Sequence, residues 1–256
     1  MVDLHCHILQ GVDDGADSMK TSLEMAETAV GEGISTIVAT PHHQHPHFQN
    51  DGASVRSAVE VLNARIQEYG IPLTIKTGQE VRLYGEITKD LSAGDSLSLA
   101  DSKYVLVEFP TSQIPAYTSR LFYELSSEGY IPVIAHPERN NVFKEQPDKL
   151  YELIKNGALS QLTTSSLTGH LGKDIKIFSQ QLLEANLVHV IASDAHNVGG
   201  RTFRFREAWN EVEKLYGKET VFMMRENAQL IAEDKHVYME PPEPVRKKKK
   251  RLFGIF

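Results

Sequence analysis

The sequence predicts an α/β protein folded as a TIM-like barrel, and this barrel is expected to be incomplete, a (β/α)7 arrangement of seven strands. The chain of 256 residues is close to the roughly 250 residues typical of (β/α) barrels. Short β-type runs alternate with longer segments of helical periodicity, as expected for parallel βα units. Histidines and carboxylates follow the ends of most of these runs, and active sites of barrels are built at strand ends.

Each predicted strand is a short apolar run bounded by polar or turn-forming residues. The predicted strands are Val2–Cys6, Ser35–Thr40, Leu73–Thr77, Tyr104–Val107, Ile131–Ala135, Leu159–Thr163 and His189–Ala192. The segments between them place apolar residues three and four positions apart, which suits helices packed against a sheet. The predicted helices are Ser18–Gly31, Ser54–Tyr69, Ala116–Glu128, Lys173–Ala185, Arg206–Tyr216 and Glu219–Glu233. No internal repeat is visible.

The chain is expected to form one domain, residues 1–240, followed by a tail, residues 241–256. A content of 41% hydrophobic and 24% charged residues is sufficient for a full core. The run Pro241-Pro242-Glu243-Pro244 is expected to end regular structure and to begin a linker.

The charge of the chain is distributed unevenly. The formal net charge is −7, and residues 246–251 read Arg-Lys-Lys-Lys-Lys-Arg. Without these six residues, 21 basic residues stand against 34 acidic ones, a net charge of −13. Binding to duplex nucleic acid rests mainly on basic side chains that neutralise phosphates. The body of the protein is therefore not expected to bind nucleic acid.

Three features predict a cytoplasmic protein. The N-terminal residues lack the basic region and the apolar stretch of a secretory signal. No uninterrupted apolar run reaches the roughly 18 residues that would span a bilayer. The single cysteine, Cys6, excludes an intramolecular disulfide framework and fits a reducing compartment.

The C-terminal tail permits two interpretations. Like charges in the basic run repel one another and cannot form a core, so one interpretation is a solvated end. The basic run is followed by Leu252-Phe253-Gly254-Ile255-Phe256, which also fits peripheral contact with an anionic membrane. Each basic residue near such a surface contributes on the order of 1 kcal/mol. Both interpretations place the tail outside the active site.

Two pairs of ligand-type residues are spaced two positions apart at strand ends. His5 and His7 lie on the first strand, where this spacing puts both imidazoles on one face and Cys6 on the other. Asp194 and His196 follow the last strand. Each pair can therefore present two side chains to one site.

Four single residues of the same chemical types follow other strands. They are His42, Glu80, Glu108 and His136. One such residue alone is more often an ordinary loop residue. However, six strand ends that all deliver a ligand-type side chain to one rim predict a polynuclear metal site. Imidazole and carboxylate ligands without thiolate favour Mn, Fe or Zn over Mg alone.

Seven short motifs surround these residues. They are His5-Cys6-His7, Asp13-Asp14-Gly15, Ala39-Thr40-Pro41-His42-His43, Gly78-Gln79-Glu80, Glu108-Phe109-Pro110, Ala135-His136-Pro137-Glu138-Arg139-Asn140 and Ser193-Asp194-Ala195-His196-Asn197. Together they resemble the PHP-class tyrosine phosphatases of capsule and exopolysaccharide operons in Gram-positive bacteria. The likeness covers nearly the whole chain and is specific in combination, although His-x-His alone occurs throughout the wider amidohydrolase-like superfamily.

The resemblance implies a PHP-type barrel that holds three metal ions, usually Mn²⁺, with Fe or Zn as possible substitutes. The implied ligands are His5, His7, Asp14, His42, Glu80, Glu108, His136, Asp194 and His196. Asp14 is chosen over Asp13 only by the family pattern, since Asp-Asp-Gly also suits a simple turn. Arg139 and Arg201 match the phosphate-side arginines of the family, and a guanidinium suits bidentate phosphate contacts. A surface arginine in a solvated loop is the alternative for both.

The loop after the second strand contains further histidines. His43, His45 and His47 have no spacing that assigns them to a metal ion. We therefore expect them at the rim of the site, near the substrate.

The resemblance implies an enzyme that hydrolyses phosphotyrosine on bacterial proteins, with an autophosphorylating tyrosine kinase and polysaccharide-synthesis enzymes as partners. Cysteine chemistry is excluded, because cysteine-dependent tyrosine phosphatases carry an arginine six residues after the cysteine, and Val12 stands there. Two alternatives stay open. One is another PHP-class phosphoesterase, acting on histidinol phosphate or on a sugar or nucleotide phosphate, and the other is a non-catalytic metal-binding scaffold.

Overall fold

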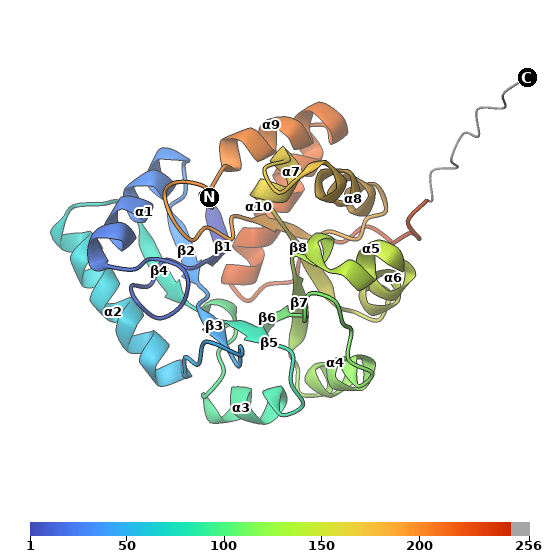
Figure 1. Ribbon diagram of the computed structural model, residues 1–256, viewed down its shortest axis with the longest axis horizontal. Helices are drawn as coiled ribbons and strands as arrows, with labels where there is room; N and C mark the ends of the chain where they lie inside the picture. The colour runs from blue at the N-terminus through green and yellow to red at the C-terminus, as the bar shows by residue number, and fades with distance from the viewer. Residues whose placement is uncertain (247–256) are drawn as a thin grey trace, which may run out of the picture.

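Parallel strands form a closed barrel in the computed structural model, which describes residues 1–246. Figure 1 shows the strands around the centre of the molecule and most of the helices outside them. All neighbouring strands that pair within the two sheets are parallel. The strand positions follow one another around the barrel in the order of the chain. Crossover connections join them, as parallel strands require.

The strands fall into two hydrogen-bonded sheets. The first sheet contains β1 (Val2–Cys6), β2 (Thr36–Ala39) and β4 (Thr74–Thr77). The second contains β3 (His42–His43), β5 (Glu80–Arg82), β6 (Tyr104–Glu108), β7 (Ile131–Ala135), β8 (Leu159–Thr163) and β9 (Val190–Ala192). β3 continues β2, and β5 continues β4, after breaks of two residues. The nine short strands of the described chain thus occupy seven positions.

The barrel closes between β1 and the segment that follows β9. The Asp194 N–H donates to His5 O at 2.9 Å, and the His7 N–H donates to Ala195 O at 2.9 Å. These bonds join the first strand position to the last, as closure of a barrel requires. The predicted (β/α)7 barrel is therefore confirmed, whereas the breaks in the second and third strands were not predicted.

The predicted helices are present, with ends shifted by at most two residues. They are α1 (Met19–Gly31), α2 (Gly52–Glu68), α4 (Thr118–Ser127), α8 (Lys173–Glu184), α9 (Phe205–Tyr216) and α10 (Lys218–Ala232). Shorter elements were not predicted. They are α3 (Ile87–Ala93), α5 (Asn141–Glu145), α6 (Asp148–Lys155), α7 (Thr164–Thr168) and 3₁₀ turns at Leu99–Asp101 and Pro137–Arg139. Elements of this length are too short to show a clear helical period in the sequence.

Helix α1 shows how the local sequence sets these elements. The Ser18 side chain accepts the Thr21 N–H at 3.3 Å and caps the first turn. Met25, Ala26 and Ala29 recur on one face and are fully buried in the core between the helices and the barrel. The apolar spacing that predicted the helix is therefore the face that it buries.

Apolar side chains pack on both faces of the barrel sheet. Along β6, Val105 and Val107 belong to the cluster between strands and helices, whereas Leu106 packs in a second cluster with Val133. Side chains alternate along a strand, so Leu106 shares its face with Glu108. The barrel interior is therefore apolar along the strands and becomes polar at their carboxyl ends.

The end of the described chain runs back over the barrel after α10. The Glu243 N–H donates to Ala185 O at 2.8 Å, and the Asn186 side chain donates to Pro241 O at 3.1 Å. No helix of residues 1–246 combines the length and the apolar character needed to cross a bilayer. The domain boundary at residue 240 stays a prediction. The predicted basic and apolar tail, apart from Arg246, lies outside the described residues.

His189 makes the stability of the fold depend on pH. Burial lowers the pKa of His189 from 6.5 to about 4, and its Nδ1 accepts the Ser160 N–H at 3.1 Å. Between these pH values the unfolded chain binds more protons at this site than the folded chain, so the free energy of unfolding falls as the pH is lowered through this window. We expect this residue to account for a loss of about 3 kcal/mol between neutral pH and pH 4.

Urea unfolding of the wild type and of His189→Gln, at about pH 7 and about pH 4, measures this contribution. The glutamine side chain keeps an acceptor for Ser160 but does not titrate. The variant should lose less stability than the wild type on acidification. An equal loss in both chains would contradict the role of His189.

Candidate metal centre

The histidine pair at the end of β1, His5 and His7, forms one side of the site that the sequence predicted. His5 and His7 project to the same face, and their Nε2 atoms lie 3.1 Å apart. Both side chains are buried. The two-residue spacing on this strand therefore brings both imidazoles to the carboxyl end of the barrel.

Glu80 lies at the centre of the site. Its Oε2 atom is 3.3 Å from His5 Nε2 and 3.4 Å from His7 Nε2. The same oxygen is 3.0 Å from His42 Nδ1, and Oε1 is 2.7 Å from His136 Nε2. Although burial opposes ionisation, these imidazoles hold the pKa of Glu80 well below its usual range. One carboxylate thus faces imidazoles from three other strand positions.

Two residues leave their strands through left-handed backbone. His136 has a φ of 33° and Asp194 a φ of 52°, a region that few non-glycine residues adopt. Asp194 Oδ1 lies 3.4 Å from the Nε2 atoms of both His5 and His7. The unusual backbone thus accompanies the inward direction of these side chains, a conformation that is typical of functional sites.

The turn after β1 gives its two aspartates different positions. Asp13 Oδ2 is 2.7 Å from His7 Nδ1 and accepts the His42 N–H at 3.1 Å. Asp14 Oδ1 lies instead 3.5 Å from His42 Nε2. Asp14 therefore belongs to the group of predicted ligand atoms, whereas Asp13 contacts the other nitrogen of His7.

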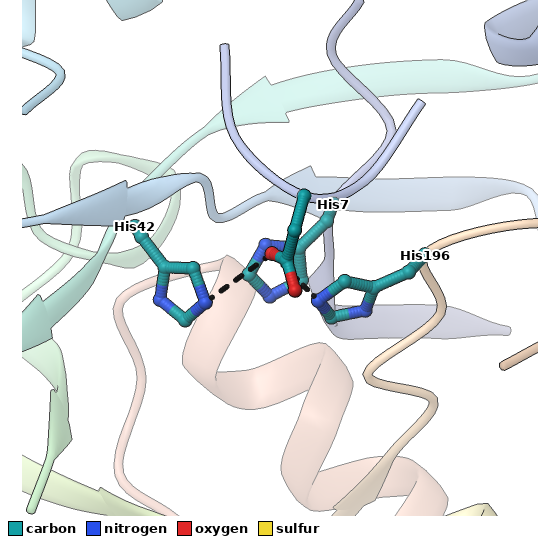
Figure 2. A group of neighbouring side chains, drawn as sticks. His7, His42 and His196 are labelled. Atoms are coloured by element: carbon teal, nitrogen blue, oxygen red, sulfur yellow. Dashed lines mark ion pairs between the residues drawn. The ribbon is translucent and has the colours of Figure 1, made fainter. Parts of the chain in front are cut away.

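Three histidines from separate segments of the chain meet around the Asp14 carboxylate. Figure 2 shows His7, His42 and His196 pointing toward one another. Asp14 Oδ1 is 3.3 Å from His196 Nε2, and the rings of His7 and His196 stack with centroids 3.8 Å apart. The segment after β1, the strand β3 and the segment after β9 thereby meet at one carboxylate.

Glu108, at the end of β6, lies on another side of Glu80. Burial and the neighbouring charge of Glu80 raise the pKa of Glu108 to about 7, and its Oε2 is 3.2 Å from Arg82 Nη1. Carboxylate oxygens of Glu80 and Glu108 lie within 4.8 Å of each other and of a nitrogen of His42. Two carboxylates at such a distance repel each other unless a cation or a proton lies between them.

Arg139 and Arg201 both contact Asp194. The Arg139 Nη1 donates to Asp194 Oδ2, and Arg201 Nη2 is 3.4 Å from the same oxygen. Arg201 Nη1 also lies 3.2 Å from Asp14 Oδ2. Their side chains are 33% and 40% exposed, so both guanidiniums border the site and can be reached from solvent.

The ligand-type atoms fit divalent metal ions. They form three overlapping groups whose atoms lie within 4.8 Å of one another: His7, Asp14, His42 and His196; His5, His7 and Glu80; and His42, Glu80 and Glu108. Within the described chain, His42 Nδ1, Glu80 Oε2 and His196 Nε2 are buried and form no hydrogen bond of normal geometry, although groups of opposite type lie 3.0 to 3.3 Å from them. Buried polar atoms need a partner, and converging imidazole nitrogens and carboxylate oxygens suit Mn, Fe or Zn.

One residue that supports the site was not identified from the sequence. Gln161 Oε1 lies 2.9 Å from His5 Nδ1, and the Gln161 side chain is fully buried on β8. A buried polar side chain in a strand requires a partner. A glutamine inside an otherwise strand-like run is the signal that could have identified it.

The expected position of His43 is wrong. The His43 side chain is buried, with 2% exposure, and does not lie at the rim. His42 and His43 are neighbours on β3, and successive side chains of a strand point to opposite faces. Because His42 turns toward the site, His43 turns away from it. His45 is only partly buried and His47 is exposed.

Residues 1–233 match the family model described as capsular polysaccharide synthesis, CpsB/CapC. The chain belongs to the CpsB/CapC family. The matched range contains every strand of the described chain and every residue of the candidate metal centre. The family pattern and the site therefore cover the same part of the molecule.

Several proteins of similar length resemble this member of the CpsB/CapC family. The chain is 50% identical to the tyrosine-protein phosphatase YwqE of Bacillus subtilis over 256 residues, which covers both chains completely. It is 40% identical to a putative tyrosine-protein phosphatase CapC of Staphylococcus aureus, again over the full length of both. It is 29% identical to the tyrosine-protein phosphatase CpsB of Streptococcus agalactiae, over 93% of this chain and all of the other.

A solved structure within the CpsB/CapC family has the same fold. The crystal structures of YwqE from Bacillus subtilis and CpsB from Streptococcus pneumoniae, described as unique metal-dependent tyrosine phosphatases, include a chain that is 49% identical. It superposes with a TM-score of 0.95 over 96% of this chain and 100% of the other. An organophosphorus hydrolase from Deinococcus radiodurans, 14% identical, shares the fold alone, with a TM-score of 0.54 over 90% of this chain and 92% of the other.

Gly15 has no room for a side chain beside β1. A Cβ atom built there would lie 2.1 Å from His7 O, so Gly15→Ala should displace the turn that holds Asp13 and Asp14. We expect a loss of roughly 1–3 kcal/mol in the free energy of unfolding, measured by urea denaturation. Gly85→Ala is the matched control, because no atom lies within 4 Å of a Cβ there. Equal stabilities of the two variants would contradict the prediction.

Proposed function

We propose that this protein is a manganese-dependent phosphoric monoester hydrolase that releases phosphate from phosphotyrosine on bacterial proteins. The observation that carries the proposal is the meeting of imidazoles and carboxylates around Glu80 at the carboxyl ends of the strands. The relatives YwqE and CpsB, named as tyrosine-protein phosphatases, support the same reaction. The description of the crystal structures of YwqE and CpsB as metal-dependent supports the metal requirement.

The proposed metal ligands combine nitrogen and oxygen donors. They are His5, His7, Asp14, His42, Glu80, Glu108, His136, Asp194 and His196. The three overlapping groups favour up to three ions per chain, and Mn²⁺ suits these donors, as Fe or Zn would. When bound, such ions supply a hydroxide nucleophile near neutral pH and positive charge beside the phosphate oxygens.

Residues around the ligands orient them and hold the phosphate group. Asp13 accepts from His7 Nδ1 at 2.7 Å, which fixes the tautomer that leaves Nε2 free to bind a cation. We assign Arg139 and Arg201 to the phosphate oxygens, because both guanidiniums border the site. A guanidinium fork matches two phosphate oxygens at once and stabilises charge that develops in the transition state.

Cys6 takes no part in the proposed reaction. Its side chain is fully buried, on the face of β1 opposite His5 and His7. Burial raises the pKa of the Cys6 thiol well above its usual value. A buried neutral thiol is a poor nucleophile, so phosphate transfer through a phosphocysteine is not expected.

The proposed partners follow from the family description, which is capsular polysaccharide synthesis. We infer that the substrates are an autophosphorylating bacterial tyrosine kinase and enzymes of polysaccharide synthesis. Partial exposure of Arg139 and Arg201 supports this inference, because a phosphotyrosine on another protein must reach them from solvent. Membrane contact through the basic tail stays a prediction.

Comparison of a phosphotyrosyl peptide with histidinol phosphate tests the substrate class. We expect kcat/KM of the manganese-loaded enzyme to be at least about tenfold higher for the peptide than for histidinol phosphate. Differences of this size are common when one substrate fits the binding contacts of a site and the other does not. Phosphate release measures both reactions. A preference for histidinol phosphate would indicate a different PHP-class phosphoesterase. No turnover of any phosphate ester by the metal-loaded protein would indicate a non-catalytic scaffold.

Arg139→Ala should separate phosphate binding from metal binding. We expect the variant to retain its metal and to lose roughly 100- to 1,000-fold in kcat, as is common when one oriented donor is removed. His136→Ala should instead lose bound metal. Arg120→Ala is the control, because Arg120 is 82% exposed on α4 and pairs only with Glu124 among the described residues. Normal turnover by Arg139→Ala would contradict the assigned role.

A further inference from the structure

A cavity lies at the end of the barrel opposite the metal centre. Its volume is about 800 Å³, and it is bordered by the carboxyl ends of α8 and α9, the start of α10 and the last described residues. His189, which lines it, directly precedes β9, whereas Asp194 follows β9. The strand thus separates the cavity from the candidate metal centre.

The cavity offers apolar surface to an occupant. The large apolar and aromatic residues that line it are Leu183, Val188, Tyr216, Met223, Met224, Tyr238 and Met239. Tyr238 and Met239 are 56% and 57% exposed. Large exposed apolar side chains beside a cavity of this size are typical of a binding site.

Carboxylates also line the cavity. Glu184, Glu219, Glu240 and Glu243 line the cavity. Glu243 pairs with Arg246 at 3.3 Å, and no ion pair within residues 1–246 involves the other three. An occupant that combines several cations with apolar side chains would match both features of the cavity.

We propose that the cavity binds the chain's own C-terminal segment, residues 247–256. Arg246 lines the cavity, and the sequence continues from it as Lys-Lys-Lys-Lys-Arg-Leu-Phe-Gly-Ile-Phe. The five cations complement the acidic lining, and Leu, Ile and two Phe side chains match the apolar surface. Ten extended residues span up to roughly 35 Å, so the segment can return to the cavity beside which it starts.

Covalent attachment favours this occupant over a free peptide. A short tether gives the segment an effective concentration in the millimolar range, so even weak intrinsic affinity fills the cavity. Aromatic anchors in an apolar cavity supply most of the affinity of such contacts. Solvent-exposed charge pairs add less and weaken with salt, so raising the salt concentration should loosen the contact without abolishing it.

Variants of the full-length chain test the proposed segment and the cavity separately. The tail variant carries Leu252→Ser, Phe253→Ser, Ile255→Ser and Phe256→Ser, which keeps the charges and removes the apolar anchors. A fluorescent synthetic peptide of residues 246–256 serves as the probe, and anisotropy measures its binding. We expect the tail variant to bind the peptide at least about tenfold more tightly than the wild type, because its own segment no longer competes.

Two added substitutions locate the contact. Met223→Glu, introduced into the tail variant, places a charge in the apolar lining and should abolish peptide binding. Tyr123→Ser is the matched control in the same background, because Tyr123 is 75% exposed on α4 and does not line the cavity. Turnover of a phosphotyrosyl peptide at the metal centre checks that each variant is folded.

Three outcomes would overturn the proposal. They are equal peptide affinity of the wild type and the tail variant, absence of saturable binding to the tail variant, and binding that persists after Met223→Glu. Trypsin provides a second measurement in the wild type, since it cleaves after lysine and arginine in residues 247–251. In the absence of vesicles, cleavage of the intact chain is expected to be slower than cleavage of the free peptide. Cleavage at the rate of the free peptide, slowed only by phosphatidylserine vesicles, would assign the tail to a membrane surface instead.

Discussion

The arrangement of the site depends on the interaction of the buried Glu80 carboxylate with the imidazoles around it. With 1% exposure, an ionised carboxylate has almost no water to stabilise it and needs positive or hydrogen-bonding partners. The partners are imidazoles at 2.7 to 3.4 Å. They come from the first, second and fifth of the seven strand positions. The charge of one side chain therefore joins segments of the barrel rim that are far apart in the sequence.

The barrel supplies this convergence through its strand breaks as well as its topology. β4 ends before Gly78, and a Cβ atom at Gly78 would lie 2.7 Å from Val38 Cγ1 and 3.3 Å from Ala39 O. Glycine therefore allows the chain to pass close to β2 before β5 begins at Glu80. The Glu80 N–H then donates to Pro41 O at 3.1 Å. The break places Glu80 and His42 side by side, paired across β3 and β5.

Much of the fold and of the site could be predicted because both rest on local patterns. Apolar runs and helical spacing identified the seven strand positions and the long helices, and the strand ends identified the converging residues. Elements of five to eight residues such as α5 and α6 were not predicted, because fewer than three turns carry little periodicity. The buried position of His43 follows from the short strand β3, which the sequence alone did not indicate. Gln161 was missed because its role depends on a contact 156 positions away.

The central claim is that the cluster around Glu80 acts through bound divalent ions. The most direct test removes metal with a chelator, restores Mn²⁺ in steps, and measures bound metal and turnover of a phosphotyrosyl peptide in the same samples. The account predicts that turnover falls by about a hundredfold or more without metal and recovers in proportion to the Mn²⁺ bound. Full turnover in samples that contain no bound metal would contradict it.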